Sequence, residues 1–414
     1  MSFERNQNPA ARADQTTVRH ANLGVVVRHL ADLGPRSRAR IAEETGLTRA
    51  TVSSLVAELI ELDLVREAGE EKASGRVGRP SRTLELHDRI VAIGLEVNVD
   101  YLAFCVEGLT GKVWQEKRVF VDNRKSSPRP VLNRLARLAE RAFAFVEQEG
   151  LVPVGVGVAV PGIVADSTGT LLRAPNLGWS RIDIADELRG RIGQVPIRVE
   201  NEANAAAVAE HWQGAAVGVR NFLSVFGEVG VGAGIFIGGE LFRGAHGFGG
   251  EFGHINVDRD GLPCACGSRG CLETLVGQEA IARNAGVVFD RRARSVTAEL
   301  VRRAEAGEAG VLRSLGEAGQ ALGSALASAV NLFDVEAIVL GGCYGPLSPW
   351  LEDGVRSMLQ TRVLSAEWSE CELRASIIGE AAATRGAAAL MLRAALAEPW
   401  QVAGRRKALL EAVL

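Results

Sequence analysis

The sequence predicts an α/β protein that begins with a winged helix-turn-helix module. Two observations support this fold class. Two short helical patterns joined by a glycine turn stand near the N-terminus, and apolar strands alternate with amphipathic helices from residue 90 onward. A third observation, a group of cysteines near residue 266, points to a metal site in the α/β part. At 414 residues the chain is long enough for two or three domains.

Composition excludes several classes of protein. Hydrophobic residues make up 47% of the chain, which fits a globular protein and not a disordered one. The net charge of −3 means that any nucleic-acid-binding surface has to be local. Apolar runs are too short for a membrane span, and no secretory signal opens the chain. Three of the six cysteines lie in a metal pattern, so the reducing cytoplasm is the expected compartment.

The N-terminal segment carries the pattern of a helix-turn-helix. A first short helix is expected at residues 25–33. Ser37 is suited to cap a second helix that Gly46 ends, and Thr48 caps a third at residues 48–62. Two short helices joined by a tight glycine turn predict a helix-turn-helix, although a generic two-helix hairpin gives the same pattern.

The residues after the turn are suited to DNA. Small, hydrogen-bonding side chains at the start of the third helix can reach base edges in the major groove. Short strands at 64–67 and 84–86 enclose a polar loop with several arginines, which predicts a wing that contacts phosphates or a minor groove. The alternative for this loop is a solvated linker. The predicted DNA-binding residues are Thr48, Arg49, Thr51, Ser53, Ser54, Arg76 and Arg79.

From residue 90 the sequence predicts a sheet that begins with antiparallel strands. The expected strands are residues 90–97, 99–106, 113–121 and 154–160, with a helix at 132–149. The last of these strands is apolar throughout, as in the middle of a sheet covered on both faces. It ends at Pro161-Gly162, at the strand edge where α/β proteins bind ligands.

Three cysteines and one histidine form a complete ligand set for a structural metal. Cys264, Cys266 and Cys271 lie within eight residues, and nine residues separate His254 from the first of them. Zn²⁺ is usually held tetrahedrally by such thiolate and imidazole ligands. Glycines between the cysteines allow the backbone to turn tightly enough to aim the sulfurs at one point. The alternative is a pair of buried thiols with a third as bystander.

These segments resemble the ROK family of repressors, open reading frames and sugar kinases. The resemblance rests on Glu-x-Gly-His at 251–254 and on Cys-x-Cys-Gly-x-x-Gly-Cys-x-Glu at 264–273. It implies a two-lobed, actin-like sugar-kinase fold of the ribonuclease H type, with a structural zinc beside a sugar pocket. It also implies that Trp179 offers a ring for the sugar to stack on. The implied sugar-binding residues are Asn176, Asn201, Glu202, Glu251, His254 and Glu273.

The resemblance also implies a division into domains. Residues 1–85 are expected to form the winged helix-turn-helix domain, and residues 86–203 the first α/β lobe. Residues 386–414 are expected to complete that lobe, while residues 204–385 form the second lobe with the zinc site. A homodimer or homotetramer on double-stranded operator DNA is the expected assembly.

Three departures from the kinases of the family predict a sensor and not an enzyme. Glu202 stands where the kinases carry the Asp that accepts the proton of the attacking sugar hydroxyl. The Asp-x-Gly-x-Thr phosphate turn is missing from residues 93–99, and Glu228 lies in the remaining glycine turn. The expected function is therefore a repressor that binds a monosaccharide without phosphorylating it. An active ATP-dependent sugar kinase is the alternative, and binding of a partner protein is a third reading.

Overall fold

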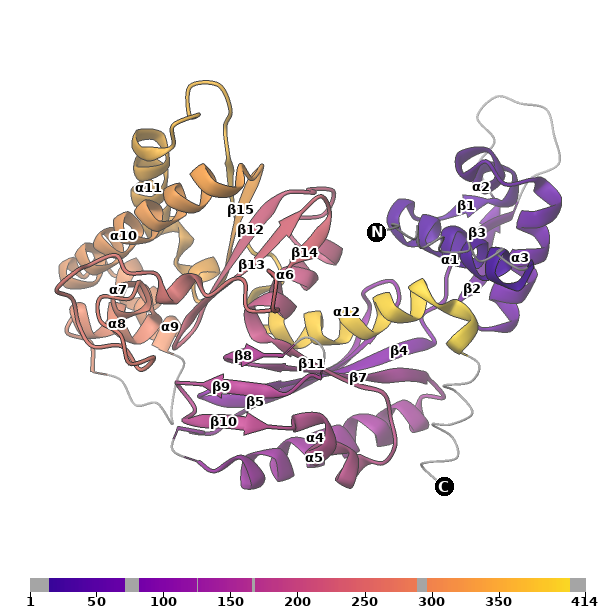
Figure 1. Cartoon of the computed structure of the whole chain (residues 1–414), viewed down its shortest axis with the longest axis horizontal. Helices are drawn as coiled ribbons and strands as arrows, with labels where there is room; N and C mark the ends of the chain where they lie inside the picture. Colours follow the sequence, from indigo (N-terminus) through magenta and orange to yellow (C-terminus); the bar gives the residue numbers. More distant parts are fainter. Residues whose placement is uncertain (1–14, 71–81, 125, 166–167, 289–295, 403–414) are drawn as a thin grey trace, which may run out of the picture.

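A computed structural model describes residues 15–70, 82–124, 126–165, 168–288 and 296–402. It contains a small N-terminal module and two five-stranded sheets, with two helices packed between the sheets (Figure 1). Among the described residues, no helix is both long enough and apolar enough to cross a membrane.

The N-terminal module is a helix-turn-helix with a small sheet. Its helices are α1 (Gln15–Leu33), α2 (Arg38–Thr45) and α3 (Arg49–Glu61), and its strands are β1 (Arg36–Ser37), β2 (Val65–Glu70) and β3 (Arg82–Leu86). The predicted caps are confirmed: the Ser37 side chain accepts from the Arg40 amide, Gly46 ends α2 with a φ of 73°, and the Thr48 side chain accepts from the Thr51 amide.

The start of the first helix differs from the sequence-based prediction, and the tip of the predicted wing lies outside the described residues. The first helix starts ten residues earlier than predicted, at Gln15 and not at residue 25. Its first turns are polar and show no apolar period, so contacts with α3 and the C-terminal helix stabilise them instead. The predicted wing strands are confirmed as the antiparallel pair β2–β3. The wing tip with Arg76 and Arg79 lies outside the described residues.

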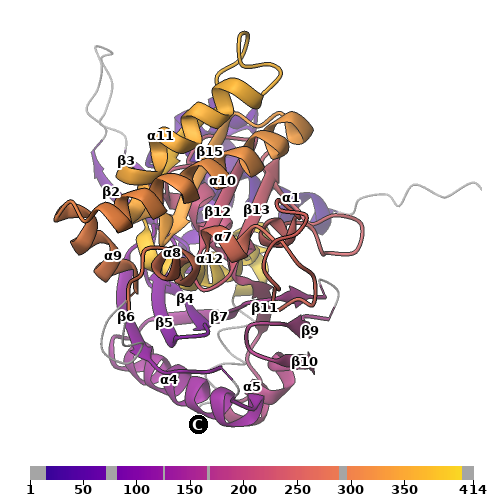
Figure 2. The same cartoon turned by 90° about the vertical axis from the view of Figure 1, so that its left-hand side faces the viewer.

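The first lobe is built on the sheet β11-β7-β4-β5-β6. Its strands are β4 (Ile90–Val97), β5 (Tyr101–Gly108), β6 (Val113–Phe120), β7 (Val152–Val160) and β11 (Ile197–Asn201). The first three strands are antiparallel neighbours, and β7 and β11 add to β4 in parallel, so the predicted antiparallel start is confirmed. Helices α4 (Pro128–Gln148) and α5 (Ile184–Ile192) cover one face, as Figure 2 shows. A small sheet of β8 (Ile163–Val164), β9 (Leu171–Ala174) and β10 (Trp179–Ile182) follows β7.

The second lobe repeats the same strand connectivity. Its sheet β14-β13-β12-β15-β16 has three antiparallel neighbours followed by two parallel additions, as in the first lobe. The strands are β12 (Phe222–Gly227), β13 (Val231–Ile237), β14 (Glu240–Phe242), β15 (Ala337–Gly342) and β16 (Glu372–Ala375). The helices are α7 (Glu273–Val276), α8 (Gln278–Asn284), α9 (Val296–Glu305), α10 (Ala309–Phe333) and α11 (Tyr344–Arg362). They pack with the outer face of this sheet into one hydrophobic core.

Helices α6 (Glu202–Gln213) and α12 (Ala382–Ala397) pack against each other between the two sheets. Glycine makes this packing possible: a Cβ on Gly386 would lie 1.7 Å from the Ala205 carbonyl oxygen, and one on Gly157 would lie 1.9 Å from the Ala387 carbonyl oxygen. The helices can therefore approach each other and the first sheet only because these positions lack side chains.

The C-terminal part of α12 packs against the N-terminal module. One hydrophobic cluster joins the buried side chains of α1, α2 and α3 with those of β4, β7 and α12. The rings of His20 on α1 and Trp400, in the short turn η3 (Pro399–Gln401), stack at a centroid distance of 4.2 Å. The module is thus docked on the first lobe by a shared core and is not held by a linker alone (Figure 1).

Gly386→Ala should destabilise the protein, because the added methyl group collides with the backbone of α6. Overpacking of this kind should lower the midpoint of thermal unfolding by about 5 °C or more, as circular dichroism would measure. The matched control is Gly316→Ala on α10, where an added Cβ meets nothing within 4 Å. A variant at residue 386 with the stability of this control would contradict the packing described here.

Candidate functional site

The six predicted sugar-binding residues line a single pocket between the lobes. Asn176 follows β9, Asn201 ends β11 and Glu202 begins α6 on the side of the first lobe. Glu251, His254 and Glu273 reach the pocket from the second lobe. Glu251 directly precedes the turn η1 (Phe252–His254), His254 ends this turn, and Glu273 is the first residue of α7. Residues almost a hundred positions apart in the chain thus converge where β7 and β11 end.

Asn201 is held rigidly at the junction of β11 and α6. Its Oδ1 accepts from the amides of Ala203 and Asn204, at 2.9 and 3.1 Å, which caps α6. Its Nδ2 donates to the Gly162 carbonyl at 2.9 Å. Since an amide group has two N–H donors, Asn201 keeps one donor for a ligand.

Glu202 is poised to bind a ligand. Its Oε2 atom is buried and has no hydrogen-bond partner among the described residues. Burial, together with the nearby carboxylates of Glu96, Glu228, Glu251 and Glu273, raises the pKa of Glu202 well above its ordinary value. This shift favours the neutral carboxyl form, which both donates and accepts a hydrogen bond and so matches a hydroxyl, which does the same.

Two further carboxylates flank His254 in the pocket. The imidazole Nε2 lies 3.9 Å from Oε2 of Glu251, and Nδ1 lies 3.7 Å from Oε1 of Glu273. Burial raises the pKa of Glu251, and the neighbouring imidazole of His254 opposes this rise. The pocket wall therefore presents a row of hydrogen-bond acceptors suited to a polyhydroxylated ligand.

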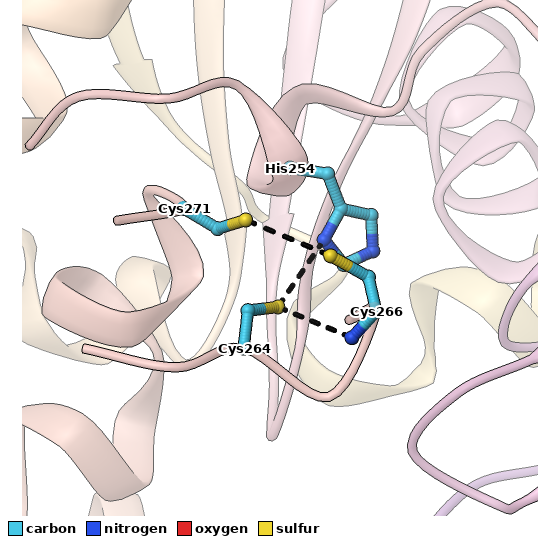
Figure 3. Close-up of side chains that lie close together, drawn as sticks. All are labelled: His254, Cys264, Cys266 and Cys271. Atoms are coloured by element: carbon cyan, nitrogen blue, oxygen red, sulfur yellow. Dashed lines mark hydrogen bonds between the residues drawn. The ribbon is translucent and has the colours of Figure 1, made fainter. Parts of the chain in front are cut away.

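The predicted metal ligands form one cluster beside this pocket. Figure 3 shows His254, Cys264, Cys266 and Cys271 pointing toward one another, and their ligand atoms all lie within 4.8 Å of each other. The Sγ atoms of Cys266 and Cys271 are 3.7 Å apart, and Sγ of Cys264 is 3.7 Å from Nδ1 of His254. Burial and a 2.8 Å contact with Glu273 raise the pKa of the Cys264 thiol, so a bound cation would be needed to stabilise its thiolate. This cluster can hold a metal ion.

The structure corrects one expectation and adds one residue. Trp179 is not in the pocket: its ring is buried in the core of the first lobe, and its Nε1 donates to the Ser126 carbonyl. Arg173 on β9 was missed, although it lines the pocket and donates to the Cys266 carbonyl at 2.9 Å. The only sequence signal for Arg173 is its place just before the turn that carries Asn176.

The glycine turn between β12 and β13 carries Glu228, as predicted, and the structure shows that this residue is buried. Glu228 is 9% exposed, and its carbonyl accepts from the Gln278 amide at 3.1 Å. Burial raises the pKa of Glu228 to about 8, with Arg118 opposing and Glu96 reinforcing the shift. Glu96, at the end of β4, is fully buried and accepts a 2.7 Å hydrogen bond from the Tyr101 hydroxyl.

The predicted DNA-binding residues of the helix-turn-helix lie at the start of α3. Arg49, Ser53 and Ser54 are exposed. The hydroxyls of Thr48 and Thr51 lie 2.8 Å apart in a hydrogen bond at the start of the helix. The opposite side of α3, made of Val52, Leu55, Val56 and Leu59, is buried in the module. The first turns of α3 are thus free to contact a partner.

Fold and site together define a class of protein: a helix-turn-helix regulator whose α/β part has a sugar-kinase-like, two-lobed architecture with an interlobe pocket. The chain belongs to the ROK family, whose model matches residues 92–394. Residues 25–76 also match the model of the MarR family.

Individual relatives agree with this class. The chain is 30% identical to the xylose repressor of Bacillus spizizenii over 92% of its own length and 97% of that protein. It resembles the structure of a ROK family transcriptional regulator, a homologue of the Escherichia coli MLC protein, with a TM-score of 0.77 and 26% identity over 94% of this chain and 99% of that one. A ROK family glucokinase from Streptomyces griseus, solved with glucose and AMPPNP, gives a TM-score of 0.63 and 29% identity over 72% of this chain and 98% of that one. The glucokinase is thus similar to a smaller share of the chain.

Glu228→Gln should change how stability depends on pH. The folded state keeps the Glu228 proton up to about pH 8, whereas the ordinary pKa is 4.5. Between these values the folded state binds more protons than the unfolded state, so wild-type stability falls as pH rises. The glutamine variant lacks this loss and should melt a few degrees higher than wild type at pH 9, with little difference at pH 4. If the melting temperatures of the variant and the wild type differ by the same amount at pH 4 and at pH 9, the buried, protonated state of Glu228 is contradicted.

Proposed function

We propose that this chain is a transcriptional repressor whose affinity for a double-stranded operator changes when a monosaccharide binds in the interlobe pocket. One observation carries the proposal: six polar side chains converge on a pocket whose wall includes the start of α6, in a chain with a docked helix-turn-helix. The similarity to a xylose repressor along nearly the whole chain supports the same function.

In the proposed complex, the sugar hydroxyls supply hydrogen-bond partners for polar groups of the pocket. The free N–H of Asn201 donates to one hydroxyl, and Glu202 exchanges hydrogen bonds with another through its unpartnered Oε2. Glu251 and Glu273 accept from further hydroxyls in charge-assisted bonds. Because the pocket is built from both lobes, the sugar stabilises the arrangement in which both sets of groups reach it.

We propose that the Cys/His cluster holds a structural Zn²⁺. Tetrahedral zinc with sulfur at about 2.3 Å keeps its sulfur ligands about 3.8 Å apart. The 3.7 Å between the sulfurs of Cys266 and Cys271 agrees with that geometry. The ion would fix the segment that carries Glu273 and would orient His254, so zinc would support the sugar pocket without taking part in chemistry.

The proposed regulator binds its sugar without phosphorylating it. Phosphoryl transfer needs a group that takes the proton of the attacking hydroxyl and a cationic cradle for the phosphates. Burial shifts Glu202 toward its protonated form, and a protonated carboxyl group takes no proton from a hydroxyl. Glu228 puts a buried side chain in the glycine turn that would have to hold a phosphate.

Other parts of the proposal rest on the sequence. The domain limits at residues 85, 203 and 385, the assembly as a homodimer or homotetramer, and the cytoplasmic location remain predictions. The same holds for DNA contacts by Thr48, Arg49 and Thr51 and, in the wing, by Arg76 and Arg79. A homodimer would place two α3 helices on two half-sites of a symmetric operator.

The test starts with a thermal-shift screen of monosaccharides that includes D-xylose and D-glucose. A sugar that stabilises the protein is then titrated into a complex with a duplex selected by the wild-type protein from a random library. We expect the sugar to change DNA affinity, measured by fluorescence anisotropy, and its L-enantiomer to have no effect. Glu202→Ala should lose this response and keep sugar-free DNA affinity, because residue 202 lies in the pocket and not on α3.

The same experiments separate the regulator from an enzyme. Calorimetry should show very weak binding of ATP-Mg²⁺. A coupled kinase assay with the stabilising sugar should show no turnover. A kcat in the usual range of about 1–100 s⁻¹ would support the sugar-kinase function instead.

Elemental analysis should find about one zinc per chain, as a closed four-ligand site requires. Cys266→Ser should lower both the zinc content and the sugar affinity, because Cys266 is a cluster member that also lines the pocket. Cys371→Ser, which changes a cysteine outside the cluster, is the control. Metal-free, folded protein with unchanged sugar affinity would contradict the structural role of zinc.

A further inference from the structure

Helix α3 carries an acidic residue next to its proposed DNA-reading surface. Glu58 follows Ser54 by four residues, so the two side chains lie one turn apart on the same side of the helix. An unpaired carboxylate at this place would repel the phosphates of a bound duplex. A helix that binds DNA with this side therefore needs a cation beside Glu58.

Arg19 of α1 supplies that cation across the module. Its Nε and Nη2 donate to Oε2 of Glu58 at 2.9 and 2.5 Å. Its Nη1 and Nη2 both lie 3.3 Å from Oγ of Ser54. Among the described residues, no other cation forms an ion pair with Glu58. Several other arginines of the module pair with other carboxylates, for example Arg38 with Glu67.

The contact with Ser54 has a chemical consequence. A guanidinium group only donates hydrogen bonds, so the Ser54 oxygen has to act as acceptor toward Arg19. The Ser54 hydroxyl proton is then directed away from Arg19. It remains available for an acceptor such as a guanine N7 or O6 atom or a phosphate oxygen.

We propose that Arg19 is a positioning residue for DNA recognition: it neutralises Glu58 and holds Ser54 as a hydrogen-bond donor toward the duplex. This inference rests on the proposed DNA-binding function. It assigns a role in operator recognition to the first helix, outside the helix-turn-helix itself. The side chains are suited to the role because both remain accessible, with 45% of the Arg19 and 28% of the Glu58 side chain exposed.

The experiment measures affinity for the duplex that the wild-type protein selects from a random library, over a range of salt concentrations. Arg19→Ala should weaken binding about fivefold, which equals about 1 kcal/mol, the interaction of two unit charges 4 Å apart in water. The double variant Arg19→Ala/Glu58→Gln should bind within about twofold of Glu58→Gln alone, because the uncompensated charge is gone. Arg302→Ala, which removes an arginine paired with Glu299 in the second lobe, is the control and should bind as wild type does.

A second readout separates positioning from a direct contact. If Arg19 acts through Glu58, the slope of log affinity against log salt stays that of the wild type in Arg19→Ala. A slope that falls by about one unit, with no rescue by Glu58→Gln, would mean that Arg19 contacts a phosphate itself and would overturn the proposal. Ser54→Ala and Arg19→Ala should also relax preference at the same base pair of the duplex.

The remaining outcomes are equally decisive. Unchanged affinity and base preference in Arg19→Ala, with specific binding by the wild type, would overturn the role of Arg19 and leave the proposed function intact. If the wild-type protein selects no duplex, both the proposed function and this inference fail. Thermal unfolding of each variant verifies that the module is folded, which is expected because all the substituted side chains are partly exposed.

Discussion

The close packing of α6 on α12 is the interaction on which the rest of the structure depends. These helices fill the space between the two sheets, and they fit there because Gly386 and Gly157 let backbones touch. The start of α6 is a wall of the pocket, where Asn201 caps the helix and Glu202 faces the cavity. The far end of α12 shares a core with the N-terminal module. The two proposed binding surfaces are thus attached to two helices that are packed together.

This arrangement limits how a sugar can act on DNA binding. A ligand changes the affinity of a distant site only as far as it binds two conformations of the protein differently. Here the pocket draws groups from both lobes, so lobe closure is a change that the sugar would favour. Because the N-terminal module shares its core with the first lobe, we expect the two to move together. In an assembly of two chains, such a movement would alter the spacing of the two α3 helices, and operator half-site spacing is a geometric requirement.

Most of the fold and of the pocket could be predicted from the sequence, but the contacts between distant segments could not. The helix caps, the strands between residues 90 and 160 and the members of the cysteine cluster follow local rules of turn chemistry, hydrophobic period and ligand spacing. The burial of Trp179 in the core could not be predicted from local rules, since an aromatic ring in a loop fits a core as well as a pocket. The early start of α1 and the pair of Arg19 with Glu58, 39 positions apart, depend on packing that no local pattern records.

The carboxyl groups around the pocket explain why the same fold can serve a regulator. Glu96, Glu202 and Glu228 are held close together in a poorly solvated region, and burial is the first cause of the raised pKa of each. A raised pKa favours the protonated form, and a protonated carboxyl group binds a hydroxyl well but withdraws no proton from it. The cleft would therefore favour a neutral polyhydroxylated ligand, which agrees with the sugar sensor proposed above.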